Sequence, residues 1–354
     1  MISSIFPARQ QLLPESGTEH PVRRRGWVSM AIIAVLAAAV GWLIYHALRV
    51  RGFDWRLVLF SLAHVRLGWL ILAVTGIYAT YWGRALRWAI FLRPLKPCPS
   101  MGNLVAATIV GFTAITLLGR PGEFVRPYLI AIKEKVPLAS QLAAWLLERI
   151  ADLLMVLLLF GFALARVGPS AEGAGPRLRW LLTEGGKFVA LAAGTILILL
   201  VFLRHFIVPA HRWLNRMMGF LPENMSTRLD RLVAGFVRGV ESTRSDRAML
   251  LVLAYSVLGW LLIIASYWCL AMSFNGFNFT IIDLIVFMGF VSLGASVQIP
   301  GIGGGVQVSA VLVLTELFGV GLEEATAFAF LIWLVTFVAV VPLGLILSVR
   351  EGLK

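Results

Sequence analysis

The sequence predicts an all-α protein that crosses a membrane several times. Of its 354 residues, 59% are hydrophobic and 14% are charged, whereas about 25% of the residues in a soluble domain are charged. Mean hydropathy is +0.87, and apolar segments recur along the chain, leaving no room for a soluble domain. The net charge of +13 does not indicate nucleic-acid binding, because the basic residues lie between the apolar segments, as they do in membrane proteins.

Several of these segments reach the roughly 20 residues that a helix needs to cross a bilayer. We expect about six full transmembrane helices, at residues 27–48, 67–92, 137–165, 188–206, 249–274 and 325–349. Residues 1–22 contain three prolines and no apolar period, which predicts a disordered cytoplasmic tail before a single transmembrane domain at 23–354. A cleaved signal peptide is the alternative for the first segment, but 27–48 exceeds its usual core of roughly 7 to 15 residues.

The charges that flank the apolar segments predict that both termini face the cytoplasm. Arg23, Arg24 and Arg25 precede the first segment, and Arg350 and Lys354 follow the last. Positively charged residues concentrate on the cytoplasmic side of membrane proteins. Four further arginines, at positions 49, 51, 56 and 66, fall on the predicted outer side and oppose this orientation.

The most basic loop predicts a helix that lies on the membrane surface. Between about 211 and 245, apolar residues such as Leu229, Leu232 and Phe236 recur at helical spacing on one face. Arginines such as Arg231 occupy the opposite face, and an amphipathic helix of this kind binds a membrane by its apolar side. A packed, soluble helical hairpin is the alternative interpretation.

The first of two breaks in the apolar pattern lies at residues 119–127. The apolar segment before it, 104–118, is about 15 residues long, which is short for a membrane span. With the apolar residues that follow, it predicts a re-entrant hairpin at about 101–133 that enters and leaves on the cytoplasmic side. Glycine permits a tight turn and proline fits the first turn of a restarted helix. The residues of these two types in the break are Gly119, Pro121, Gly122 and Pro127.

The same break carries three charged residues that predict an anion site. Arg120 and Arg126 each offer several hydrogen-bond donors, which suit a phosphate or a carboxylate. The N–H groups of the restarted helix would add partial positive charge. Glu123 would pair with either arginine or act as a protonatable switch. The alternative is a cytoplasmic turn with an ordinary ion pair.

A second polar group lies inside the third predicted span. Gln141, Glu148 and Asp152 fall within about 40° of one helix face by the 3.6-residue period. Arg149 lies a quarter-turn away and would reach Asp152 three residues on. Carboxylates within a membrane usually face a cavity and have charged partners, for which the arginines of the first break are the further candidates. We interpret this group as part of a water-filled cavity for a head group; a buried structural ion network is the alternative.

The second break is rich in glycine and follows the apolar segment 281–299. It predicts a second re-entrant hairpin, at about 281–318, that enters from the opposite face and makes an inverted repeat with the first. The glycines would let two half-helices break and would present Gln298 and Gln307 to a cavity, whereas a helix-packing motif is the alternative. A nucleotide loop is not indicated, because the strand and the Lys-Ser/Thr pair are missing. The residues of this break are Pro300, Gly301, Gly303, Gly304, Gly305 and Gln307.

The sequence contains no pattern for bond-making chemistry. H-E-x-x-H, G-x-S-x-G and S-x-x-K are absent, and Cys98 and Cys269 provide neither a disulfide framework nor a metal pattern. We therefore expect a transporter-like protein rather than an enzyme, with no cofactor, no metal and no nucleic-acid partner.

These motifs resemble the transmembrane region of lysylphosphatidylglycerol synthase, which belongs to a flippase-like family. The resemblance rests on G-R-P-G-E-x-x-R-P at 119–127, E-R-I-x-D at 148–152 and P-G-x-x-G-x-x-Q at 300–307, and it covers roughly 27–349. It implies a lipid translocation fold in a bacterial or archaeal cytoplasmic (inner) membrane. The residues that we expect to bind the substrate are Arg120, Glu123, Arg126, Glu148, Arg149, Asp152 and Gln307, although many relatives carry Glu in place of the last.

The expected function is movement of an anionic, polar-headed lipid between leaflets, through a cavity formed by the two hairpins. A phospholipid and a polyprenyl-phosphate lipid are the candidate substrates. Because the chain stops at Lys354, we expect no aminoacyltransferase domain and no charging of lipid with lysine. One alternative is a membrane subunit that presents lipid to, or docks, a separate lipid-modifying enzyme. Another is a membrane-embedded enzyme that modifies lipid itself.

Overall fold

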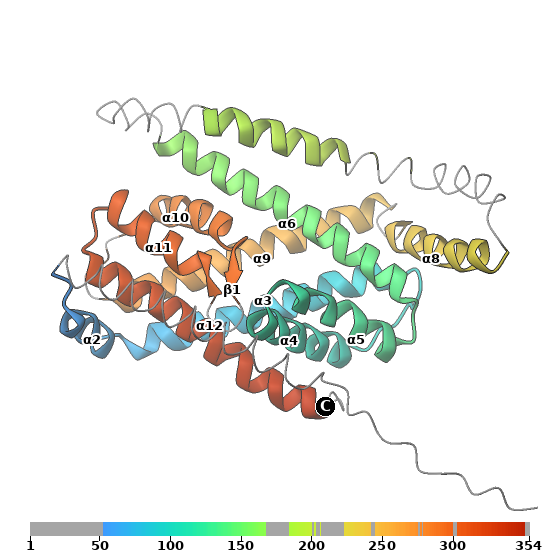
Figure 1. Cartoon of the computed structure of the whole chain (residues 1–354), viewed down its shortest axis with the longest axis horizontal. Helices are drawn as coiled ribbons and strands as arrows, with labels where there is room; N and C mark the ends of the chain where they lie inside the picture. Colours follow the sequence, from blue (N-terminus) through green and yellow to red (C-terminus); the bar gives the residue numbers. More distant parts are fainter. Residues whose placement is uncertain are drawn as a thin grey trace, which may run out of the picture. The chain divides into compact units, whose positions relative to one another are not determined.

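The computed structural model describes residues 52–167, 184–199, 202, 206, 223–241, 245–274, 277, 279–299 and 303–350. The described residues of the compact unit Trp55–Lys354 are almost entirely helical (Figure 1). The predicted all-α class is thereby confirmed, apart from two strands of two residues each. The predicted tail at 1–22 and the first predicted span at 27–48 lie outside the described residues.

Long helices occupy most of the predicted spans. They are α3 (Leu67–Leu92), α6 (Leu138–Val167), α9 (Asp246–Ser273) and α12 (Leu322–Arg350), and residues 184–199 supply part of a further one. By length and composition, three helices of the described part could each cross a membrane: α4 (Met101–Leu118), α9 and α12. A fourth span results if α2 (Trp55–Ala63) and α3, bent by 83°, count as one. The predicted number of six full spans is not confirmed, since α6 is not among these candidates and the predicted spans at 27–48 and 188–206 lie wholly or partly outside the described residues.

The helices α3 and α9 pack against each other and run antiparallel. The N–H of Arg66, just before α3, donates to the carbonyl of Ser273, the last residue of α9, at 2.9 Å. Ten residues along α3, a Cβ added to Gly76 would lie 2.2 Å from the Ser266 hydroxyl oxygen. A position without a side chain lets two helices approach closely, as is common in membrane helix pairs. The second half of α3 therefore lies beside the first half of α9.

A buried hydrophobic core joins α3 to the first hairpin and to α6. Trp88 and Phe91 of α3 pack in it with Leu104 of α4, Ile130 of α5 (Val125–Glu134) and Leu147 of α6. All five side chains are buried. This core fixes the separation of the helices that carry the polar site.

The first break folds into a helical hairpin, as predicted. After α4, Gly119 adopts φ 71°, a 3₁₀ helix η1 runs over Arg120–Phe124, and α5 continues from it and contacts α4. Pro121 lies in the first turn of η1 and Pro127 in the first turn of α5, as expected. A Cβ on Gly122 would lie 2.3 Å from the backbone of Ala114, so η1 rests directly on α4.

The first half of this hairpin is longer than the apolar pattern indicates. The α4 helix begins at Met101 because the side chain of Ser100 caps it, accepting a hydrogen bond from the Asn103 N–H at 3.5 Å. Its 18 residues make α4 a candidate span by length and composition, so the segment is longer than the predicted 15 residues or so. Whether the hairpin re-enters a membrane stays a prediction.

The carboxylate of Glu134, the last residue of α5, connects the two ends of the same hairpin. Its oxygens accept from Lys96 Nζ and Asn103 Nδ2, each at 2.7 Å, and from the Ser100 N–H at 3.2 Å. The side chain is buried, and charge-assisted hydrogen bonds of this kind are the strong ones. The break therefore lies at the free end of a closed hairpin.

The second break also folds into a hairpin. Helix α10 (Ile281–Gly294) leads into strand β1 (Gln298–Ile299), which pairs antiparallel with β2 (Gly303–Gly304) before α11 (Gly305–Glu316) returns against α10. These strands correct the purely helical prediction. Gly304, at φ 92°, has the positive φ that glycine adopts readily, at the point where β2 ends and α11 begins. Of the predicted break residues, Pro300 and Gly301 lie outside the described residues.

The two helices of this second hairpin are in close contact. A Cβ on Gly294 would lie 2.6 Å from the carbonyl oxygen of Gly305, and a Cβ on Gly305 would meet the carbonyl of Gly294 in turn. At 14 and 12 residues, each helix is shorter than the roughly 20 residues of a span. The close contact and the short helices are consistent with the predicted re-entrant hairpin.

Helix α8 (Glu223–Glu241), in the basic segment, packs against α6 along one edge. A Cβ on Gly239 would lie 2.6 Å from Ala143, and Val240 is buried. Leu229 and Leu232 of the predicted apolar face are exposed, so this face is only partly covered by protein. Contact of α8 with a membrane surface stays a prediction, and residues 211–222 lie outside the described part.

We expect Gly122→Ala to destabilise the folded protein by about 1 to 3 kcal/mol, because the added methyl group would overlap the α4 backbone. Gly102→Ala is the matched control, since a Cβ there has only the Ser100 hydroxyl at 3.9 Å. Both changes restrict the unfolded chain equally. Thermal unfolding in detergent measures the difference, and equal stability of the two variants would contradict direct packing of η1 on α4.

Candidate functional site

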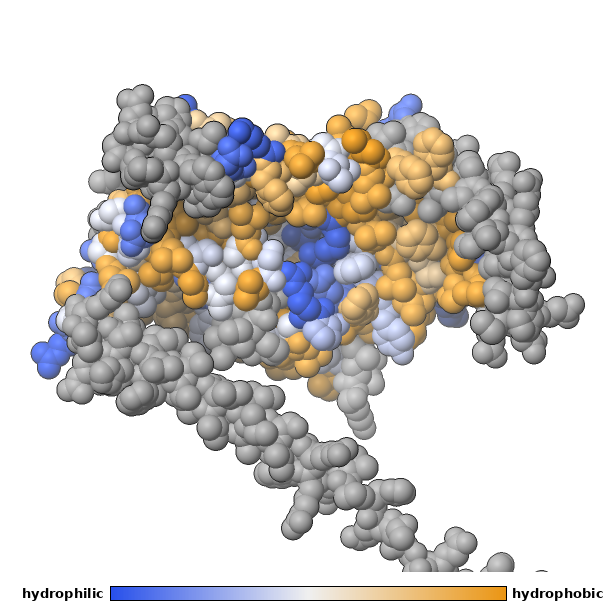
Figure 2. All heavy atoms as spheres, turned by 45° about the horizontal axis from the view of Figure 1, so that its top comes forward, coloured by the Kyte–Doolittle hydropathy of each residue, from blue (hydrophilic) through white to orange (hydrophobic). Residues whose placement is uncertain are grey.

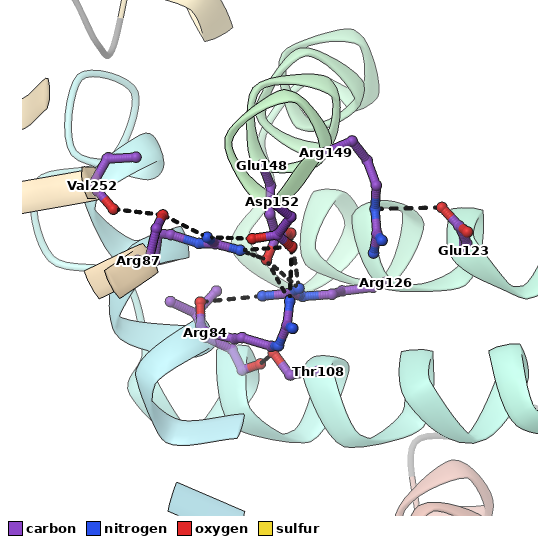
Figure 3. A network of polar contacts seen from close by, with 11 residues as sticks. Arg84, Arg87, Thr108, Glu123, Arg126, Glu148, Arg149, Asp152 and Val252 are labelled. Carbon is purple, nitrogen blue, oxygen red and sulfur yellow. Dashed lines mark hydrogen bonds and ion pairs between the residues drawn. The ribbon is translucent and has the colours of Figure 1, made fainter. Parts of the chain in front are cut away.

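A network of ionic side chains lies where α3, the first hairpin and α6 meet (Figure 3). Every member is joined to another by a salt bridge, and most members are buried. The network has an inner part around two carboxylates of α6 and an outer part around one carboxylate of η1. Its members are Arg84, Arg87, Arg120, Glu123, Arg126, Glu148, Arg149 and Asp152.

Glu148 is the centre of the inner part. Its side chain is fully buried, and Arg126 Nη1 donates to its two oxygens at 3.1 and 3.0 Å. Arg87 Nη2 also donates to Glu148, and Arg84 Nη1 approaches it at 3.5 Å. The predicted ion pair between Glu148 and an arginine of the first break is therefore confirmed. Three guanidinium groups from two separate elements converge on one carboxylate.

Asp152, one turn further along α6, takes its partners from α3. Arg87 Nη1 donates to it at 2.8 Å and Arg84 Nη1 at 3.2 Å. The predicted pairing of Asp152 with Arg149 is wrong, because Arg149 extends from another side of α6 toward Glu123 (Figure 3). Arg87 also donates to the Ser256 hydroxyl at 2.8 Å, which connects the network to α9.

Glu123 holds the outer part together. One of its carboxylate oxygens accepts from Arg120 at 2.8 Å, and the other lies 3.4 Å from Arg149 Nε. Glu123 is buried, whereas 52% of the Arg120 side chain and 34% of the Arg149 side chain are exposed. Arg120 Nη2 also donates to the carbonyl of Ser296 at 2.7 Å. Both outer arginines are therefore partly exposed, and Arg120 also links the first hairpin to the second.

The Arg126 side chain is held rigidly by its neighbours. Its guanidinium carbon lies 4.1 Å from the centre of the Trp88 ring, and its Nη2 donates to the Arg84 carbonyl at 3.2 Å. Gly111 of α4 admits this residue, since a Cβ there would lie 2.6 Å from the Arg126 Cβ. Trp88 is itself fixed by donating to Gln141 at 2.9 Å. Arg126 is therefore preorganised before any ligand binds.

Hydrogen-bond donors without an acceptor gather near η1. Among the described residues, the buried nitrogens Arg126 Nε, Trp145 Nε1 and Arg149 Nε have no hydrogen-bond partner. The 3.4 Å approach of Arg149 to Glu123 is an ion pair without hydrogen-bond geometry. Trp145 packs against Phe124 of η1, with ring centroids 5.2 Å apart. Buried donors normally have a partner, so these nitrogens can accommodate further acceptor atoms.

The charges of the network do not balance. Five guanidinium groups face three carboxylates, an excess of two positive charges. Arginine donates up to five hydrogen bonds and accepts none, which suits phosphate or carboxylate oxygens. The described residues contain no group of three or more side chains that could hold a metal ion. Chemically, the site can bind an anion with several oxygens.

The described surface contains both hydrophilic and hydrophobic areas (Figure 2). Figure 2 shows a hydrophilic patch in the middle of one face, with hydrophobic residues on both sides. Large apolar side chains are exposed on the helices that make candidate spans, as expected for a surface that faces lipid tails. A polar ligand with an apolar tail would meet both kinds of surface.

The structure brings together six of the seven predicted substrate-binding residues, and Gln307 is the exception. Its Oε1 accepts from the N–H of Gly304 at 2.8 Å, so it caps the start of its own helix. No described contact joins Gln307 to the ionic network. The helix N–H groups expected at the first break are partly used, since Gly122 donates to Gly119 and Val125 to Gly122.

Sequence reasoning missed Arg84 and Arg87 as members of the site. The sequence could have indicated them, because two arginines three residues apart inside an apolar span cost free energy unless they have charged partners. The predicted partners of the α6 carboxylates were Arg149 and the arginines of the first break. The pairing joins residues more than 60 positions apart.

Comparison with protein families matches residues 27–344 to the family described as Lysylphosphatidylglycerol synthase TM region. The match covers most of the chain. This protein belongs to that family. No curated protein and no solved structure matches the chain. As the family name and the apolar helices indicate, it is an integral membrane protein with a lipid-related function.

We expect Glu148→Gln to destabilise the protein by about 3 to 5 kcal/mol, since it would leave buried guanidinium groups without their shared counter-charge. The control is Glu184→Gln, which breaks the exposed pair with Lys187 and should cost less than about 1 kcal/mol. Thermal unfolding in detergent compares the variants. A Glu148→Gln protein as stable as the control would show that the network does not depend on this charge.

Proposed function

We propose that this protein moves an anionic lipid between bilayer leaflets, with the phosphate group bound by the ionic network. The observation that supports this most directly is Arg126, a buried arginine at a helix break with an unpartnered Nε. A buried cation is costly, and surplus positive charge beside free donors favours an anionic ligand. Membership of a lipid-related family and the exposed apolar helices support a lipid as the carrier of that anion.

The outer arginines would make the first contact with the head group. Arg120 and Arg149 are the most exposed members and both pair with Glu123, so a phosphate would compete with one carboxylate for two guanidinium groups. Displacement of Glu123 would then free the guanidinium groups of Arg120 and Arg149 for the phosphate. In this scheme Glu123 is the exchangeable counter-ion.

The inner carboxylates would have a different role. Glu148 and Asp152 are each shared by more than one arginine and are buried. They would hold the guanidinium groups in place and limit the net positive charge of the site, so that a head group can bind and dissociate again. Because nothing in this scheme breaks a covalent bond, the lipid would cross unchanged.

The proposal includes the membrane setting. The site would lie at the meeting point of two re-entrant hairpins in a bacterial or archaeal cytoplasmic membrane, with both termini on the cytoplasmic side. Arg120 in the first hairpin and Ser296 in the second, joined at 2.7 Å, bring the breaks together as such a site requires. The phosphate of a phospholipid or of a polyprenyl-phosphate lipid fits the same donors.

We expect Arg126→Ala to lower the rate of lipid exchange at least about tenfold, which corresponds to roughly 1.4 kcal/mol of lost transition-state stabilisation. The assay reconstitutes the pure protein in liposomes and follows leaflet exchange of labelled phosphatidylglycerol, a polyprenyl phosphate and phosphatidylcholine, with and without a proton gradient. Arg166→Ala is the control, because Arg166 is an exposed arginine in the last turn of α6 away from the network.

Selective exchange of the anionic lipids that is lost in Arg126→Ala and kept in Arg166→Ala would establish the proposed function. Full exchange by Arg126→Ala would refute the role of this residue. No exchange of any lipid by folded wild-type protein would refute the translocase and favour a subunit that presents lipid to a partner enzyme. Chemical change of a lipid during the assay would instead favour an enzyme.

A further inference from the structure

A polar pocket lies where α3 ends and α9 begins, outside the ionic network. It has a volume of about 340 Å³. One wall is the stripe Leu86, Ile90 and Arg93 on α3 and just after it, and the other is the stripe Arg247, Leu251 and Tyr255 on α9. The loop between α3 and α4 contributes Pro97 and Pro99 and closes one end. None of these residues belongs to the network described above.

The pocket is polar at one end and apolar along its length. Arg93 follows the last residue of α3 and Arg247 is the second residue of α9, so the antiparallel packing of these helices places both arginines at the same end. From there, Leu86 is about 10 Å away along α3 and Tyr255 about 12 Å away along α9, by the rise of about 1.5 Å per residue. Between them the walls are aliphatic.

The two arginines have no carboxylate partner among the described residues, and neither Glu nor Asp lines the pocket. Arg247 is the second residue of α9, where Asp246 already supplies the negative charge that favours a helix N-terminus. An anion bound between the guanidinium groups of Arg93 and Arg247 would supply the counter-charge that these two side chains lack. The Tyr255 hydroxyl offers one more donor inside the pocket.

We propose that this pocket binds a lipid by its phosphate group, with Arg93 and Arg247 on the phosphate and an acyl chain along Leu86, Ile90 and Leu251. Inorganic phosphate would pair with the two arginines but would leave the apolar walls of the pocket uncovered, whereas the acyl chain of a lipid would cover these walls. Leu86, Ala89 and Ile90, which line the pocket from α3, lie on either side of Arg87 in the sequence, and Tyr255 precedes Ser256, the partner of Arg87. The pocket is therefore a holding site one turn away from the ionic network.

The test measures binding and does not depend on transport. Native mass spectrometry of the full chain in detergent counts phosphatidylglycerol molecules retained during a titration, with phosphatidylcholine and inorganic phosphate as the other probes. We expect the double variant Arg93→Ala/Arg247→Ala to bind one phosphatidylglycerol about thirtyfold more weakly, since each basic residue near an anionic lipid contributes about fivefold. The control is Arg166→Ala/Arg350→Ala, which removes two exposed arginines at the ends of other helices.

A second variant tests the apolar part of the site. Leu251→Trp fills the pocket without changing charge, and it should also lose one bound phosphatidylglycerol. Unchanged binding in both pocket variants, or an equal loss in the control, would overturn the proposal. If inorganic phosphate at equal concentration displaced the lipid, the pocket would be an anion site rather than a lipid site. Because Arg126→Ala should remove a different lipid, losses that add would separate this site from the translocation site.

Discussion

The buried carboxylate of Glu148 is the constraint on which the arrangement of the site depends. It is fully buried, and a carboxylate in that setting is tolerated only with several charged donors around it. Arg87 of α3 and Arg126 of α5 meet that need from opposite elements. The positions of α3 and of the first hairpin against α6 must therefore neutralise this carboxylate as well as pack the hydrophobic core around Trp88.

Glycines determine how closely the hairpins can approach this centre. Gly111 admits Arg126 beside α4, and Gly122 lets η1 rest on the α4 backbone. In the second hairpin Gly294 and Gly305 bring α10 and α11 into contact. Among its described residues, each break also contains one glycine with positive φ, Gly119 or Gly304. The two hairpins are thus built by the same means, although their sequences differ.

Local periodicity predicted much of this structure but not its pairing. The 3.6-residue period placed Gln141, Glu148 and Asp152 on one face of α6, and all three indeed contact residues of α3. It could not supply the partners, because Arg84 and Arg87 approach only through tertiary packing. Gln307 is a case in which the prediction named the wrong partner. The glycine break before it suggested that its side chain faces a cavity, but the side chain accepts a hydrogen bond from the Gly304 N–H at the start of its own helix. The break positions were predictable because proline and glycine act through the backbone alone.

The hydrogen bond from Arg120 to the Ser296 carbonyl has a thermodynamic consequence. It is the contact of the ionic network that reaches the second hairpin in the described part of the chain, and its donor is half exposed. A ligand that occupies this guanidinium competes with the bond, so occupancy and separation of the hairpins become linked equilibria. The coupling is reciprocal: the factor by which a bound ligand favours separated hairpins is also the factor by which contact between the hairpins weakens ligand affinity. The Arg120 side chain would then couple ligand binding at the site to the separation of the two hairpins.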